Sequence, residues 1–293
     1  MTNFIPSLRL RTLPLSVAGI ILGTGLAYQS PFTFHFSLFT FILSLLTALS
    51  LQILSNLSNE LGDALKGTDA DQHGREAYGL QAGTVTVPQM KRMILLFVAL
   101  SILFGSALIF TAFGFPITND KSQMTNILIF LGLGLLAIVG AIKYTLGKHS
   151  YGYIGLGDLG VFLFFGLLST LGAYYLQTQT LNWEVFWCGV AVGLPCVGVL
   201  NLNNIRDMYN DRAHNKRTLA SALGPMGAKI YHTCLLIVAL AIMGIYGHFW
   251  SLCVLPVWVW HLWFVWTHEE AQLDKQMPVL MFSTLLFSVL ACL

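Results

Sequence analysis

Charged residues are scarce in this sequence of 293 residues. Asp, Glu, Lys and Arg together make up 10% of it, whereas about 25% is usual in a soluble globular domain. The formal net charge is only +2, so charge gives no indication of a nucleic-acid partner. Hydrophobic residues make up 56%. This composition excludes an ordinary soluble domain and indicates an integral membrane protein.

Motifs for several common chemistries are also missing. The sequence has neither a GxSxG nucleophile motif nor a phosphate-binding P-loop. It contains no CxxC pair, and its histidines are not spaced as zinc ligands. The cysteines all lie in apolar runs, so no disulfide framework is predicted for Cys188, Cys196, Cys234, Cys253 and Cys292.

Nine apolar stretches are long enough, or nearly long enough, to cross a bilayer, which takes about 20 residues in a helix. We therefore predict an all-α, polytopic membrane protein with about nine transmembrane helices in one domain, residues 1–293. The last two stretches are short, and a count of eight is the alternative. The stretches lie at about 12–29, 36–57, 93–115, 125–145, 155–177, 184–203, 229–248, 250–267 and 277–293.

The basic residues predict how the chain is oriented in the membrane. If the N-terminus is placed in the cytoplasm, Lys121 is the only one of the fifteen Lys and Arg residues that falls outside. Cytoplasmic loops carry an excess of Lys and Arg, so this bias predicts the orientation. We expect a protein of the cell (inner) membrane whose N-terminus and two longest loops, 58–92 and 204–228, face the cytoplasm.

A polar, carboxylate-rich segment follows the second apolar stretch and is the first candidate site. Asn56, Asn59 and Asp63 are spaced three and four residues apart, so in a helix they share one face. Gly67 is predicted to end that helix. Two further carboxylates follow on the next loop, Asp69 and Asp71. Such oxygen ligands suit Mg²⁺, which takes one or two carboxylates and completes its shell with water and phosphate.

A second segment of the same kind follows the sixth apolar stretch. Asn203 and Asp207 align with Asn59 and Asp63 of the first segment, and Asp211 lies one helical turn beyond Asp207. Any single one of these carboxylates is most simply interpreted as a solvated charge. Two clusters of aligned Asn and Asp at helix ends favour a functional site instead.

The alignment of the two segments predicts a pseudo-repeat with units at roughly 12–150 and 155–267, followed by a final helix. Two acidic clusters would then face each other across a central cavity and would repel unless cations lie between them. Transporters also place their sites between repeats, so a cation-coupled transporter is one alternative. It would need broken helices near the bilayer midplane, whereas these segments lie at helix ends.

Basic residues lie among the carboxylates. Each could simply be a signal of cytoplasmic topology. Arg212, Lys216 and Arg217, however, closely follow Asp211, and carboxylates alone would not bind a diphosphate. Carboxylate-bound Mg²⁺ together with nearby cations is the combination that a diphosphate needs.

A glycine-rich segment, residues 143–158, is the third candidate site. It joins the fourth and fifth apolar stretches on the predicted cytoplasmic side. For Tyr151 and Tyr153, a role as interfacial anchors is as plausible as a role in the site. Asp158 could be a charge favoured at a helix N-terminus, but it is expected level with the two acidic segments. Asp158 and Tyr144 are therefore candidates for a role toward a substrate.

Four segments together resemble the UbiA superfamily of membrane prenyltransferases: Arg9–Pro14, Asn56–Asp69, Tyr144–Asp158 and Asn203–Ala220. The resemblance spans nearly the whole chain. It implies a nine-helix bundle around a central cavity that opens to the cytoplasmic side, with Mg²⁺ as the cofactor. It also implies a hydrophobic tunnel that holds the tail of a polyprenyl diphosphate and opens toward the lipid bilayer.

The resemblance also implies roles for individual residues. The implied metal ligands are Asn59, Asp63, Asp69, Asn203, Asp207 and Asp211. The implied diphosphate-binding residues are Lys66, Arg75, Arg212, Lys216 and Arg217. The candidates for catalysis are Asp63, Asp207, Asp211, Asp158 and Tyr144. The sequence does not rank Asp158 against Tyr144 for positioning the acceptor, and Glu60 stands where the family usually has Asp.

The last two of the four segments are most similar to family members that act on 1,4-dihydroxy-2-naphthoate. The resemblance therefore implies Mg²⁺-dependent transfer of a polyprenyl chain to that acceptor, with loss of CO₂ and diphosphate. The product would be demethylmenaquinone, in menaquinone biosynthesis. Transfer to another aromatic acceptor such as 4-hydroxybenzoate is the alternative. The sequence gives neither the isoprenoid length nor the oligomeric state.

Overall fold

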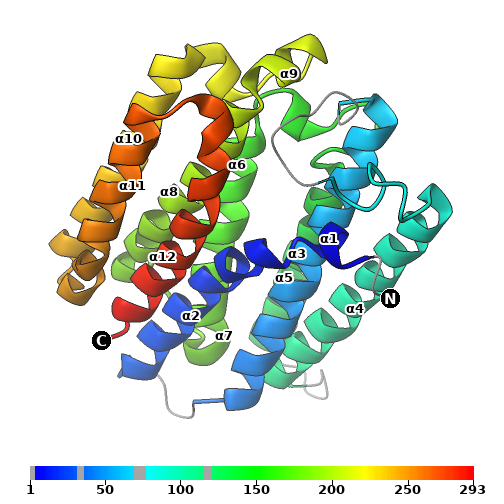
Figure 1. The fold of residues 1–293 in the computed structure, drawn as a ribbon. Coiled ribbons are helices and arrows are strands. Elements are labelled where there is room, and N and C mark those ends of the chain that lie inside the picture. The colour runs from blue at the N-terminus through cyan, green and yellow to red at the C-terminus, as the bar shows by residue number, and fades with distance from the viewer. Residues whose placement is uncertain (1–3, 32–35, 69–76, 115–120) are drawn as a thin grey trace.

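The computed structural model describes residues 4–31, 36–68, 77–114 and 121–293, which form a bundle of long helices (Figure 1). Among these residues, nine helical segments are long and apolar enough to cross a membrane, which confirms the predicted number. The described part is all-α, as predicted, with no strand beyond an isolated bridge between Ile154 and Arg217. Five of the spans each consist of one long helix: α3 (Leu38–Lys66), α4 (Val87–Phe113), α5 (Lys121–Lys143), α8 (Trp183–Arg206) and α10 (Leu219–Ile245), which kinks within its length.

The other four spans are built from shorter helices in series. They are α1 (Ile5–Leu8), η2 (Leu10–Thr12) and α2 (Leu13–Gln29); α6 (Gly157–Val161), η4 (Phe162–Leu168) and α7 (Ser169–Thr178); η5 (Phe249–Val254) and α11 (Leu255–Thr267); and η6 (Glu270–Gln276) and α12 (Met277–Leu290). Proline lies in the first turn of α1, α2, α11 and α12, where its missing N–H leaves no helical hydrogen bond unmade. Two short helices, η3 (Tyr151–Tyr153) and α9 (Met208–Ala213), lie between spans.

The first candidate segment forms the last part of α3, which runs to Lys66 rather than ending near residue 57. Asn56, Glu60 and Asp63 are buried on this part of the helix. The helix continues because these polar groups point into the protein rather than toward lipid. Gly67 ends the helix, as predicted, with a φ of 75° that favours glycine.

The second candidate segment spans a break between helices. Asp207 ends α8, and α9 follows at once. α10 begins well before residue 229, the predicted start, because Thr218 and Ser221 cap it with reciprocal hydrogen bonds. The helix then kinks at Gly224, where φ is 74°. Much of the predicted loop 204–228 is therefore helical.

Helix α8 lies at the centre of the bundle and packs against α10, α12, α7 and η4. Seventy-two per cent of its most apolar window is buried, whereas the fractions for α4 and α5 are 17% and 11%. These two helices therefore leave most of their surface for lipid. η4 is a π-helix, and its Gly166 meets Gly193 of α8 so closely that a Cβ on Gly166 would lie 2.6 Å from the Gly193 Cα. Small residues allow this close approach of two backbones.

The three candidate segments meet at one end of the bundle. α3 and α8 both end there, and α9 lies beside them (Figure 1). The side chain of Asn210 on α9 donates a hydrogen bond of 2.8 Å to the carbonyl oxygen of Thr68, just after α3. The N–H of Arg217 donates at 3.1 Å to the carbonyl oxygen of Tyr153 in the glycine-rich segment. The fold thus brings together regions that are far apart in the sequence.

Candidate active site

A cavity of about 350 Å³ lies among α2, α3, α5, α7 and α8. Both acidic segments contribute to its wall: Asn59 and Asp63 from α3, and Asn203 and Asp207 from the end of α8. Lys216 lines it as well. Much of the remaining wall is apolar and includes Ile20, Leu108, Ile109, Phe164 and Leu176. A single cavity therefore joins a polar, charged region to a region suited to hydrocarbon.

Asp63 is buried and held by two hydrogen bonds. The hydroxyl of Tyr153 donates to its Oδ1 at 2.7 Å. In the amide orientation that satisfies its neighbours, Asn59 donates to Asp63 Oδ2 at 3.1 Å and accepts from Arg9 Nη1 at 3.1 Å. Burial and the Asp63 carboxylate raise the pKa of Tyr153, so this tyrosine remains a donor near neutral pH. Tyr153 thus supports a candidate ligand, rather than only anchoring the chain at the interface.

Asp207 is held by the neighbouring Arg206. The guanidinium donates from Nε to Asp207 Oδ1 at 2.7 Å and from Nη2 to Asp207 Oδ2 at 2.6 Å. Nη2 also donates to Asn203 Oδ1 at 2.8 Å. Such a two-point pairing fixes the plane of the carboxylate. One arginine therefore orients both side chains that the second segment contributes to the cavity wall.

Asp211 lies deeper than Asp207 and is fully buried. Burial raises its pKa to about 6, although Lys216, with Nζ 3.2 Å from Asp211 Oδ1, opposes the shift. Burial alone would lower the pKa of Lys216, but Asp211, Asp63 and Asp207 together raise it above its ordinary value. The ammonium group of Lys216 therefore remains charged between the two acidic segments.

The other cations predicted to bind diphosphate are placed differently. Lys66 donates to the carbonyl oxygen of Thr145 and to the hydroxyl of Ser150. Arg212 and Arg217 are exposed. Among the described residues, Lys216 is the only member of the predicted diphosphate set in the cavity lining. Three predicted residues lie outside the described part of the chain: Asp69, Asp71 and Arg75.

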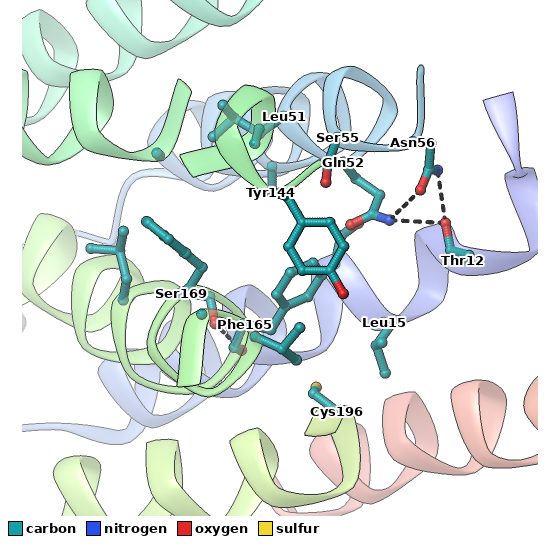
Figure 2. A pocket seen from close by; sticks show the side chains of 18 of the residues that line it. Thr12, Leu15, Leu51, Gln52, Ser55, Asn56, Tyr144, Phe165, Ser169 and Cys196 are labelled. Carbon is teal, nitrogen blue, oxygen red and sulfur yellow. Dashed lines mark hydrogen bonds between the residues drawn. The ribbon is translucent and has the colours of Figure 1, made fainter. Parts of the chain in front are cut away.

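The two candidates for positioning an acceptor are separated by the structure. Tyr144 lines the cavity, and Figure 2 shows its ring among the lining side chains. Burial raises the pKa of its hydroxyl, so the group stays protonated and can donate. Asp158 is not part of the cavity lining, and its carboxylate lies close to Tyr231 instead. This placement favours Tyr144 for contact with a substrate.

Several polar cavity residues are not among those predicted from the sequence. Gln52 donates to Thr12 at 3.0 Å and to Asn56 at 3.1 Å, and Asn56 donates to Thr12 at 3.0 Å (Figure 2). Arg9 also lines the cavity and lies 4.0 Å over the ring of Tyr78. Gln52 could have been found, since it precedes Asn56 by one helical turn within a membrane helix. Glu60 is not part of the cavity lining and instead accepts a hydrogen bond from the N–H of Leu80 at 2.7 Å.

The donor atoms of this site fit Mg²⁺ only if water and substrate oxygens complete its coordination shell. Among the described residues, no three Asp, Glu, His or Cys side chains are close enough to hold a metal ion by themselves. Each wall instead offers one amide and one carboxylate, Asn59 with Asp63 and Asn203 with Asp207. Mg²⁺ commonly takes one or two carboxylates and completes its shell with water and substrate phosphate. The oxygen donors therefore fit an ion that arrives with a phosphate-bearing substrate.

The chain is similar to known proteins over most of its length. The model of the UbiA prenyltransferase family matches residues 16–286. The chain is 42% identical to the 1,4-dihydroxy-2-naphthoate octaprenyltransferase of Escherichia coli, over 84% of this chain and 76% of the relative. It is 40% identical to the enzyme of the same name from Haemophilus influenzae, over 79% of this chain and 72% of the relative.

Solved structures share the fold. A UbiA homologue from Aeropyrum pernix K1 superposes with a TM-score of 0.65 at 18% identity, covering 95% of this chain and 98% of that one. A UbiA homologue from Archaeoglobus fulgidus bound to DMAPP and Mg²⁺ gives 0.61 at 15% identity, covering 98% and 99%. The chain belongs to the UbiA prenyltransferase family and is a multi-pass membrane enzyme that transfers prenyl groups.

Proposed function

We propose that this enzyme transfers a polyprenyl chain from polyprenyl diphosphate to 1,4-dihydroxy-2-naphthoate in a Mg²⁺-dependent reaction. CO₂ and diphosphate are released, and demethylmenaquinol, the reduced (hydroquinone) form of demethylmenaquinone, is formed for menaquinone biosynthesis. Relatives at 40–42% identity carry the name of this activity. The acceptor preference rests on that similarity.

The observation that carries the proposal is the composition of the cavity. One end of a prenyl diphosphate is highly charged and the other is a hydrocarbon. The cavity combines Asp63, Asp207 and Lys216 with a largely apolar wall. A site for a small polar substrate would not need that wall, and a site for a lipid tail alone would not need buried charges.

Ionisation of the allylic carbon–oxygen bond is the step that these polar residues assist. It leaves diphosphate and an allylic carbocation. Asn59 and Asp63 on one wall, and Asn203 and Asp207 on the other, would hold the metal, with Asp69 and Asp211 as further predicted ligands. Bound Mg²⁺ supplies positive charge that stabilises the departing diphosphate. Lys216, already charged within this cluster, adds a charge-assisted hydrogen bond to the same oxygens.

The acceptor attacks the carbocation from an electron-rich ring carbon. Tyr144 is the lining residue that we assign to orienting a ring hydroxyl, because its own hydroxyl is a protonated donor at the cavity wall. The new bond forms at the ring carbon that carries the carboxylate. The ring regains aromaticity by losing CO₂ from that carbon, with the electron pair of the broken bond returning to the ring.

The enzyme is proposed to lie in the cell (inner) membrane with the polar end of the cavity toward the cytoplasm. The motif-bearing ends of α3 and α8 lie at the same end of the bundle (Figure 1). Lys66, Arg206 and Lys216 lie at this end, and an excess of Lys and Arg is typical of the cytoplasmic side.

The direct test uses purified enzyme with Mg²⁺, a polyprenyl diphosphate and a single aromatic acceptor. With 1,4-dihydroxy-2-naphthoate we expect a prenylated naphthohydroquinone lipid, identified by mass spectrometry as such or as the quinone that air forms from it. Removal of divalent cations with a chelator should abolish the product, and added Mg²⁺ should restore it. Product with 4-hydroxybenzoate and none with dihydroxynaphthoate would place the enzyme in another branch of the family.

A further inference from the structure

Arg206 contacts more than one carboxylate. Its Nε and Nη2 atoms donate to Asp207, while Nη1 donates to Oδ1 of Asp274. Asp274 lies in η6, which begins the last membrane span and is 68 residues away in the sequence. The guanidinium of Arg206 is therefore shared between a cavity carboxylate and a carboxylate outside the cavity lining.

Asp274 also reaches the first span. Its Oδ2 atom lies 3.3 Å from Nη1 of Arg11, at the start of that span. Arg11 donates in addition to the hydroxyl of Tyr78 at 3.3 Å. One carboxylate thus accepts from two arginines, Arg11 of the N-terminal segment and Arg206 at the end of α8.

Burial makes this sharing consequential. The side chain of Arg206 is only 3% exposed, and that of Asp207 is 10% exposed. Water therefore cannot replace a lost partner of this guanidinium at little cost. If Asp274 were neutral, Asp207 would be the only carboxylate among the described residues left paired with Arg206, and Arg11 would lose its partner Asp274 as well. The neighbourhood of Asp207 would become more positive.

We propose that Asp274 is a positioning residue that holds Arg206 and thereby keeps Asp207 available to a divalent cation. The inference rests on the proposed function, in which Asp207 is a metal ligand. Arg206 already uses one hydrogen-bonding position on each oxygen of Asp207. The remaining lone pairs bind a cation more weakly when the guanidinium donates fully to the same carboxylate. Because Asp274 also accepts from Arg206, its negative charge offsets part of the positive charge of the guanidinium.

The test is the affinity for Mn²⁺ in the presence of inorganic pyrophosphate, measured by electron paramagnetic resonance on purified protein. We expect Asp274→Asn to weaken Mn²⁺ binding by about ten-fold or more, since a partner is removed from a buried charge cluster. Asp274→Glu keeps the charge and should recover part of that loss. The matched control is Glu269→Gln, which removes an exposed carboxylate beside the same helix and should change the affinity less than about two-fold.

The outcomes separate this inference from the proposed function. Wild-type affinity in Asp274→Asn would overturn the positioning role while leaving the metal site in place, and so would an equal loss in Glu269→Gln. Absence of Mn²⁺ binding in the unmodified enzyme would overturn both the metal assignment and this inference. If Asp274→Asn does not fold, as judged by circular dichroism and thermal melting, Asp274→Ser decides, since it also removes the charge. An affinity weaker by about ten-fold in Asp274→Ser supports the role, and an unchanged affinity contradicts it.

Discussion

Lys216 lies where electrostatics requires positive charge. From the sequence, two facing acidic clusters need cations between them, and the structure places the ammonium group of Lys216 near Asp63, Asp207 and Asp211. Arg212 and Arg217 are exposed instead. The sequence alone could not separate these three cations, because their directions depend on the turn after α9. That turn includes Asn215 in a left-handed conformation, with φ of 55°.

Replacing Lys216 should therefore affect catalysis far more than replacing its exposed neighbour. We expect Lys216→Met to lower kcat/KM by about 100-fold or more, because a charged donor to the leaving group is lost. Arg217→Met, one residue away and exposed, should lower it less than about five-fold. Initial rates at varied prenyl diphosphate concentration give both values. Equal losses in the two variants would show that Lys216 has no special role.

Asp63 and Asp207 should each be indispensable for turnover but not for folding. Asn has nearly the same shape as Asp, so Asp63→Asn and Asp207→Asn should leave the helical bundle intact. Each should nevertheless reduce turnover by about 100-fold or more, because a carboxylate ligand of the metal contributes several kcal/mol to charge stabilisation. Circular dichroism reports the fold, and product formation reports the chemistry. A folded Asp63→Asn enzyme with wild-type turnover would refute the metal assignment.

At the scale of the helices, hydropathy predicted the number of spans but not all of their ends. Apolar length is a local property, so nine spans could be counted from the sequence. The C-terminal end of α3 is a polar stretch that is helical because it is buried against other helices. The start of α10 contains Gly224 and Pro225 and depends on its N-terminal cap. The π-helix η4 and the hydrogen bonds of Asp63 and Asp207 are tertiary features, which a single sequence does not encode locally.

The crossing of η4 and α8 should not tolerate a larger residue. We expect Gly166→Ala to lower the free energy of unfolding by about 1–3 kcal/mol, because the new methyl group would meet the backbone of Gly193. Gly132→Ala on α5 is the matched control: nothing lies within 4 Å of the added Cβ, and helix propensity favours alanine by about 1 kcal/mol. Thermal melting in detergent compares the two. A stabilised Gly166→Ala protein would contradict the close approach.

At the scale of the whole molecule, the orientation in the membrane remains a prediction from the basic residues. It can be tested with single cysteines in a background that lacks the five native ones. A cysteine at His214, beside the polar end of the cavity, should react with a membrane-impermeant reagent only after the cells are opened. A cysteine at Lys121 should react in intact cells. The reverse pattern would place the active site on the outer face.

The pseudo-repeat of units 12–150 and 155–267 also remains a prediction. The two acidic segments do line one cavity, from α3 and from the end of α8. The segments differ in detail, however: the first lies within a continuous helix, and the second contains a break at Asp207. The two segments therefore present the same side-chain types, an Asn and an Asp, from different backbone structures.

The central claim, prenylation of dihydroxynaphthoate at the carbon that carries its carboxylate, is tested most directly by the fate of that carboxylate. Dihydroxynaphthoate labelled in the carboxyl group is incubated with the enzyme, Mg²⁺ and a polyprenyl diphosphate, and the gas phase and the lipid product are counted separately. The account predicts one labelled CO₂ for each prenyl group transferred, with no label in the lipid. Label retained in the prenylated lipid would contradict it.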